Sequence, residues 1–204
     1  MAMRGDGTRE HEGGEAGEII SLVRAATGGD RWSFERLVAI HQEALFRMVY
    51  ARMQNRADAE DVVQDVFLSA YRGLASLRDP GLFRAWLYRI ALNRVRDFMR
   101  RRRLASLFGL NHDEAPEDCP DSGPDEFDHL AASRFWAGLN GFLASLPSLQ
   151  REVFRLRFLD HLGIQEIAAA LGRNESTVKT HLYRAIEKFK VVGPRYGLPA
   201  QEES

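Results

Sequence analysis

Residues 164–189, IQEIAAALGRNESTVKTHLYRAIEKF, contain two short apolar patterns of helical period with a glycine between them. Gly172 stands where a left-handed C-cap ends a helix, and Asn174 to Ser176 offer N-cap residues for a second helix. The apolar residues of the two patterns are Ile164, Ile167, Ala168 and Leu171, followed by Val178, Leu182, Ala185, Ile186 and Phe189. The stretch therefore predicts a helix-turn-helix, a unit whose second helix enters the major groove of DNA.

The polar face of the second helix is the part expected to contact DNA. Residues near its N-terminus would face base edges, while Arg184 and Lys188 would lie near phosphates. The candidate contacts are Ser176, Thr177, Lys179, Thr180, His181, Tyr183, Arg184 and Lys188. The alternative is a solvated basic face on a structural helix hairpin. Because the turn, the period and the charge all agree, we favour DNA binding.

Residues 18–104 show a second region of helical period and predict a separate helical domain. The triplet Asp79-Pro80-Gly81 is a turn signal before a helix that starts near Leu82. Seven arginines lie between Arg89 and Arg103, with Asp97 as the one acid among them. The net charge of −1 for the whole chain therefore hides a surface suited to a polyanion.

Trp86 lies on the basic side of this arginine-rich helix, together with Arg89, Asn93, Arg96 and Arg100. Arginines that follow phosphates, beside an aromatic ring that stacks on unpaired bases, are typical of single-stranded nucleic acid binding. Phe83 and Tyr88 would enlarge this stacking surface. The alternative is that Trp86 packs in the core, as aromatics at helical spacing usually do.

The remaining segments are predicted to be tails and a linker. Residues 1–17 are predicted to be a flexible tail, residues 105–128 an acidic linker with eight acids and three prolines, and residues 193–204 a second tail. Residues 129–192 form the domain that holds the helix-turn-helix. The expected fold class is all-α, with two small helical domains joined by the acidic flexible linker.

Several classes of function find no support in the sequence. His112, Cys119 and His129 match no zinc-ligand spacing, so we expect neither a metal nor another cofactor. No phosphate-binding glycine loop and no nucleophile elbow is present, which argues against an enzyme. The single cysteine indicates a reducing compartment, the cytoplasm. No apolar run is long enough to insert into a membrane, and no signal peptide is visible.

Three motifs in a fixed order resemble the extracytoplasmic-function (ECF) group of bacterial RNA polymerase sigma factors. The resemblance covers roughly residues 18–104 and 130–190. Its motifs are DAEDVVQDVF at residues 58–67, FRAWLYRIALN at residues 83–93, and Leu146-Pro147 followed by Glu166-Ile167-Ala168 and Thr177-Val178-Lys179-Thr180. The resemblance implies a subunit that binds core RNA polymerase, recognises a promoter and opens the DNA strands.

The resemblance also implies a role for each motif. The first would bind the clamp helices of the polymerase β′ subunit, the second the −10 element, and the third the β flap and the −35 element. The polymerase-binding candidates are Glu60, Asp61, Gln64, Asp65, Phe67 and Leu68, and those for the −10 element are Leu77, Arg78, Phe83, Trp86, Arg89, Asn93, Arg96 and Arg100. The linker would pass through the polymerase cleft, and an anti-sigma factor would hold the protein inactive.

Two other functions stay open at this point. A stand-alone regulator would bind an operator as a symmetric dimer without polymerase. Its likeness is local: Thr180-His181-Leu182 is similar to the regulator class typified by quorum-sensing activators. An RNA-binding or antitermination factor would use the arginine-rich helix and bind RNA as well as DNA.

Overall fold

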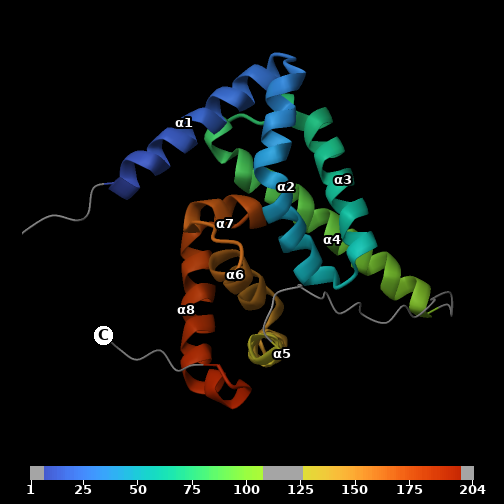
Figure 1. Cartoon of the computed structure of the whole chain (residues 1–204), viewed down its shortest axis with the longest axis vertical. Helices are drawn as coiled ribbons and strands as arrows, with labels where there is room; N and C mark the ends of the chain where they lie inside the picture. Colours follow the sequence, from blue (N-terminus) through green and yellow to red (C-terminus); the bar gives the residue numbers. More distant parts are fainter. Residues whose placement is uncertain (1–6, 108–125, 199–204) are drawn as a thin grey trace, which may run out of the picture. The chain divides into compact units, whose positions relative to one another are not determined.

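The computed structural model describes residues 7–107 and 126–198, and it describes side chains for residues 17–107 and 133–198. The described chain contains helices and no strands. It separates into two compact units, residues 1–117 and 118–204, and each unit is described by itself. The predicted all-α, two-domain fold is confirmed (Figure 1).

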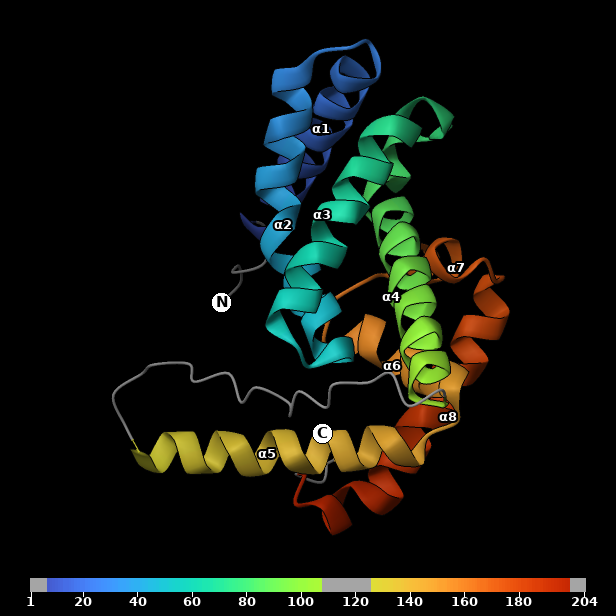
Figure 2. The same cartoon turned by 90° about the vertical axis from the view of Figure 1, so that its right-hand side faces the viewer.

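The N-terminal unit is built from four long helices and two short 3-10 turns. These are α1 (Gly7–Thr27), α2 (Arg31–Met53), α3 (Arg56–Gly73), η1 (Leu74–Ser76), η2 (Pro80–Leu82) and α4 (Phe83–Leu107). Helix α2 contacts α1, α3 and α4, and in the view of Figure 2 helix α3 lies between α2 and α4. The fully covered side chains include Leu37, Leu45, Val49, Val66 and Leu87. All five belong to the region for which the sequence predicts helical period.

Side-chain caps define where the helices of this unit begin. Asp30 caps α2 by accepting hydrogen bonds from the backbone N–H groups of Trp32 and Ser33, at 3.1 and 3.3 Å. Asn55 caps α3 by accepting from the N–H of Asp58 at 2.9 Å. Asp79 accepts from the N–H of Gly81 at 2.9 Å at the predicted turn signal. Each cap satisfies a backbone donor that the helix itself leaves free.

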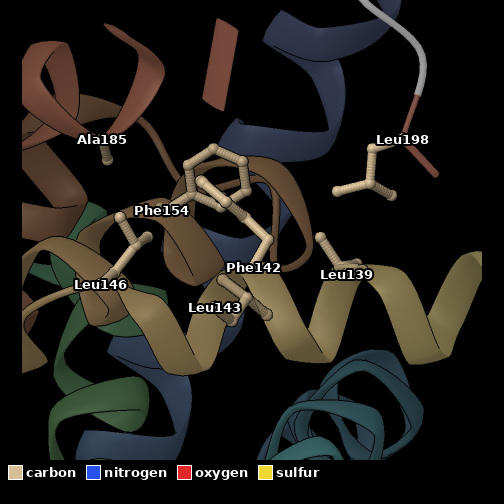
Figure 3. Packing of buried hydrophobic residues seen from close by; sticks show 7 residues of the cluster. All are labelled: Leu139, Phe142, Leu143, Leu146, Phe154, Ala185 and Leu198. Carbon is tan, nitrogen blue, oxygen red and sulfur yellow. The ribbon is translucent and has the colours of Figure 1, made fainter. Parts of the chain in front are cut away.

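The C-terminal unit contains α5 (Glu126–Ser145), α6 (Ser148–Phe158), α7 (Ile164–Leu171), α8 (Glu175–Val192) and η3 (Gly193–Tyr196). Figure 1 shows α5 end-on while α8 runs in the plane of view, so these two helices cross steeply. The core of this unit is apolar and consists mainly of leucine and phenylalanine (Figure 3). It comprises Leu139, Phe142, Leu143, Leu146, Phe154, Ala185 and Leu198.

The ends of both units differ from the predicted boundaries. Helix α1 starts at Gly7, so part of the predicted flexible tail is helical. Residues 193–198 do not form a tail, because Tyr196 packs against the core and Leu198 is buried within it. The acidic linker predicted for residues 105–128 lies mostly outside the described residues, as do His112 and Cys119.

Candidate nucleic-acid and polymerase interface

The helix-turn-helix is formed by α7 and α8, as the sequence predicts. Gly172 adopts a left-handed conformation, with φ of 61°, and its N–H donates to carbonyls of the last turn of α7. Asn174 then caps α8 by accepting from the N–H of Thr177 at 2.8 Å. Val178 and Ala185 of α8 are buried against the rest of the unit. The turn thus presents the first turns of α8 to solvent.

Most of the predicted DNA contacts of α8 lie on its accessible face. Tyr183 is 66% exposed, the largest apolar surface on that face. The hydroxyl of Thr180 donates to the carbonyl of Ser176 at 2.9 Å, and Lys179 lies 3.4 Å from the carboxylate of Glu175. Ser176, Lys179, Thr180, Tyr183 and Arg184 are exposed, while Thr177 and His181 are half-buried. These residues form one polar surface that can enter a groove.

Lys188 does not belong to this surface, which corrects the sequence-based prediction. Its Nζ donates to the backbone carbonyl of Ser145 at 2.5 Å, and the residue is half-buried. Ser145 is the last residue of α5, so the ammonium satisfies a carbonyl at a helix C-terminus, where a positive charge is favourable. Lys188 therefore joins α8 to α5, and this hydrogen bond directs its ammonium toward α5.

Helix α4 presents a basic face in the N-terminal unit. Arg96 donates to the side-chain oxygen of Asn93 at 2.8 Å, and Arg100 lies 3.1 Å from the carboxylate of Asp97. Arg89 is exposed and makes no ion pair with any described residue. Asp97 is the one acid from residue 89 to residue 103, and it pairs with Arg100, so the other arginines of this face keep their positive charge. Such a face attracts a phosphate backbone.

The aromatic residues at the start of α4 are less accessible than the sequence suggests. Phe83 is 1% exposed and Tyr88 is also 1% exposed, so neither ring can stack on a base in this conformation. Phe83 is covered by His41 of α2, with ring centroids 5.4 Å apart. The prediction that Phe83 contacts the −10 element is therefore wrong for this state, and Tyr88 does not enlarge the stacking surface.

Trp86 is half-buried, so part of its surface remains accessible. Its ring lies 6.0 Å from that of Phe83, and it packs beside Gly73 at the end of α3, where a Cβ would lie 3.5 Å from Cζ2. Of the residues before it, Arg78 is exposed and Leu77 is half-buried. Trp86 and Arg89 thus share the start of α4 with the loop that carries Arg78.

Helix α3 carries the acidic face predicted to bind polymerase. Glu60, Asp61, Gln64, Asp65 and Leu68 are exposed, and among the described residues Asp61 and Asp65 have no ion-pair partner. Phe67 is buried, so it supports the helix from inside and does not contact a partner. The exposed apolar residues here are Leu68, at 46%, and Tyr71, at 53%. Spacing of three residues from Leu68 could have identified Tyr71, which the sequence analysis missed.

The sequence also did not predict a polar contact between α3 and α4. Arg94 donates to the hydroxyl of Ser69 at 2.8 Å, and that hydroxyl donates to the carbonyl of Asp65 at 2.7 Å. Arg94 is therefore tied to the helix with the acidic face and does not join Arg89 on the basic face. Helical spacing alone cannot assign an arginine to a partner 25 residues away.

Two helical units, one with an acidic and a basic face and the other with a helix-turn-helix, are features typical of a DNA-binding protein. A family model described as Sigma-70 region 2 matches residues 37–105, and one described as Sigma-70, region 4 matches residues 139–189. The sigma factor CnrH of Cupriavidus metallidurans is 33% identical over 182 residues, which is 87% of this chain and 95% of CnrH. NccH of Alcaligenes xylosoxydans xylosoxydans is 33% identical over 171 residues, 83% of this chain and 91% of NccH.

The ECF sigma factor SigE of Mycolicibacterium smegmatis is 32% identical over 158 residues, 78% of this chain, and the chain spans 60% of the length of SigE. The solved structure of CnrH in complex with the cytosolic domain of CnrY superposes with a TM-score of 0.63 at 28% identity, covering 87% of this chain and 98% of that one. The chain belongs to the ECF group of bacterial RNA polymerase sigma factors. It is a transcription initiation factor. No helix among the described residues is long and apolar enough to cross a membrane.

Proposed function

We propose that this chain binds core RNA polymerase through α3 and directs it to a promoter read by two surfaces. The −35 element contacts α8 and the −10 element contacts the start of α4 with its preceding loop. One observation supports this division: the exposed acids of α3 and the exposed arginines of α4 lie on different helices of one compact unit. An acidic surface suits a basic protein partner, and a basic surface suits DNA.

The −10 surface comprises Leu77, Arg78, Trp86, Arg89, Asn93, Arg96 and Arg100 in this proposal. The −35 surface comprises Ser176, Thr177, Lys179, Thr180, His181, Tyr183 and Arg184. Phe83, Phe67 and Lys188 are left out because their side chains are buried or engaged. The protein acts without catalysis of its own and without a cofactor, in the cytoplasm, where the polymerase is.

An anti-sigma factor is part of the proposal. The CnrH structure contains the cytosolic domain of CnrY. The similarity to CnrH covers 87% of the present chain. We expect a partner of the same kind to hold this chain away from polymerase until a signal releases it.

The polymerase surface can be tested by charge removal. The double variant Asp61→Asn, Asp65→Asn should bind core polymerase more weakly by about fivefold or more, because two exposed carboxylates facing a basic partner are lost. The control is Glu43→Gln, which removes an exposed acid of α2 that pairs with Arg47. Binding of labelled chain to sigma-free core is measured by fluorescence anisotropy. Equal affinity of the double variant and the control would rule out α3 as the docking helix.

The stand-alone regulator and the RNA-binding factor predict different behaviour. A regulator binds a specific duplex tightly without core polymerase, and a gel-shift titration with the purified chain detects this. An RNA-binding factor binds ribo- and deoxyribo-oligomers of one sequence equally well. The sigma factor proposal predicts weak duplex binding alone, a preference for DNA, and co-purification with core polymerase.

A further inference from the structure

The C-terminal segment, residues 193–198, lies beyond the part of the chain that matches the region 4 model, which ends at residue 189. It is nevertheless folded onto the unit. Gly197 turns the chain with φ of 71°, and the N–H of Leu198 donates to the carbonyl of Gly193 at 3.2 Å. Leu198 is 3% exposed and lies over Leu139 of α5 (Figure 3). The segment thus returns from the end of α8 to the surface of α5.

Helix α5 has a notch that receives this segment. A Cβ on Gly138 would lie 2.0 Å from the backbone carbonyl oxygen of Tyr196, and one on Gly141 would lie 2.9 Å from its Cδ1. Real Cβ atoms essentially never come this close to another heavy atom, so both positions need glycine while the segment is in place. Glycine in a helix interior costs about 1 kcal/mol relative to alanine, and the close packing offsets that cost.

The same contacts link α5 to the helix that faces DNA. The ring of Phe142 on α5 meets Phe189 of α8 at 5.1 Å and Tyr196 at 6.5 Å, both edge to face. Lys188 adds its hydrogen bond to the carbonyl of Ser145 at the end of α5. Helix α8 is therefore held against α5 at its C-terminal half, far from its N-terminal turns. Because the C-terminal half of α8 is fixed against α5, the direction of its N-terminal turns is fixed as well.

We propose that Tyr196 and Leu198 are positioning residues for DNA recognition: by docking on the Gly138 and Gly141 notch, they fix the angle at which α8 is presented. This inference rests on the proposed function of α8 as the −35 reader. Without the docked segment the helices still form, because α6 and α7 also contact α8. The Lys188 hydrogen bond and the Phe142–Phe189 ring contact then remain, and by themselves they allow a wider range of angles between α5 and α8.

The test uses the full chain with Tyr196→Ala, and with Tyr196→Phe as the conservative variant. Spin labels on cysteines introduced at Asn140 and Glu187, both exposed, report the distance between α5 and α8 after Cys119→Ser removes the natural thiol. Tyr196→Ala should broaden the distance distribution, and Tyr196→Phe should leave it narrow, because the packing uses the ring. Helix content and unfolding temperature are recorded for each variant.

The functional arm uses the holoenzyme and a promoter fragment mapped from transcripts made with the unaltered chain. Tyr196→Ala should weaken binding to a fragment that carries the −35 element by about fivefold or more, and should not affect a fragment with that element scrambled. If Tyr196→Ala only lowers the unfolding temperature, with distance and affinity unchanged, the residue is structural and the proposal fails. If the unaltered chain yields no promoter fragment, the proposed function fails, while the distance measurement still decides the docking.

Glycine substitutions give an independent check. Gly141→Ala should broaden the distance distribution in the natural background but have little further effect beside Tyr196→Ala, because the clashing ring is then absent. Gly138→Ala should displace the segment in either background, since the clash is with backbone. The control is Gly17→Ala on α1, where a Cβ meets nothing within 4 Å. Equal effects of Gly141→Ala in both backgrounds would contradict the docking.

Discussion

His41 is a buried histidine in the N-terminal unit, 6% exposed, and its Nε2 has no hydrogen-bond partner. Burial, with a smaller contribution from the charge of Arg84, lowers its pKa to about 4. The folded unit therefore holds His41 neutral, while the unfolded chain takes up a proton below the ordinary pKa of 6.5. Protonation thus favours unfolding, and stability present above pH 6.5 is lost as the pH falls toward 4.

This linkage gives a prediction for the N-terminal unit. Its free energy of unfolding should fall between pH 6.5 and 4 by up to roughly 3 kcal/mol from this group. His41→Leu should remove that part of the slope, because leucine takes up no proton. Urea unfolding is followed through Trp32 and Trp86, with Trp136→Phe to silence the C-terminal unit. If the free energy of unfolding falls equally with pH in the unaltered chain and in His41→Leu, protonation of His41 does not cause the loss of stability.

Trp86 offers the second prediction at this scale. If its ring stacks on an unpaired base, Trp86→Ala should cost about 1–3 kcal/mol in binding a single strand that carries the −10 element. Trp32→Ala is the matched control, since Trp32 is 63% exposed on α2 and faces no predicted DNA contact. Binding is measured with the holoenzyme by fluorescence anisotropy. An equal loss in both variants, or a loss of helix content in Trp86→Ala, would contradict stacking.

At the scale of elements, the start of α8 depends on Asn174. Its side-chain oxygen accepts from the N–H of Thr177 at 2.8 Å and from the hydroxyl of Ser176 at 2.9 Å. Asn174→Ala should cost about 0.5–2 kcal/mol, because an N-cap acceptor is lost, and Asn174→Asp should keep most of the stability. Hydrogen exchange of the first turn of α8 and thermal unfolding measure the effect. Equal hydrogen-exchange protection in the alanine and aspartate variants would show that the Asn174 side chain does not stabilise the first turn of α8.

Local signals in the sequence were sufficient for the two helices of the helix-turn-helix and for the turn between them. The glycine at 172 needs a left-handed backbone, and asparagine at 174 needs a free helix N-terminus, so both could be predicted from neighbouring residues alone. Helical period over residues 18–104 likewise predicted a helical domain, which α1 to α4 form. These features depend on contacts within one or two turns of a helix, which a linear sequence displays directly.

Features that depend on distant contacts could not be predicted in the same way. Phe83 is buried because His41 of α2 covers it, and Lys188 is engaged because it reaches a carbonyl 43 residues earlier. Tyr196 and Leu198 sit in a segment too short to show a period. Their partners are glycines whose role becomes visible only when α5 and the C-terminal segment meet. Packing between elements, not local preference, decides these four positions.

At the scale of the molecule, the two units carry different surfaces that we propose for transcription initiation. The N-terminal unit combines an acidic helix face with a basic one, and the C-terminal unit presents α8. Neither unit alone carries both surfaces proposed to recognise the promoter. The proposed function therefore requires both units in one chain, and it can be judged only in the presence of polymerase.

Transcription with sigma-free core polymerase on genomic fragments tests the central claim most directly. The purified chain should produce discrete new transcripts, whose start sites share two upstream sequence elements at a fixed spacing. The double variant Asp61→Asn, Asp65→Asn should reduce all of these transcripts together, because it weakens binding to core polymerase. If the unaltered chain is folded and binds core polymerase yet yields no new start sites, the account of its function is wrong.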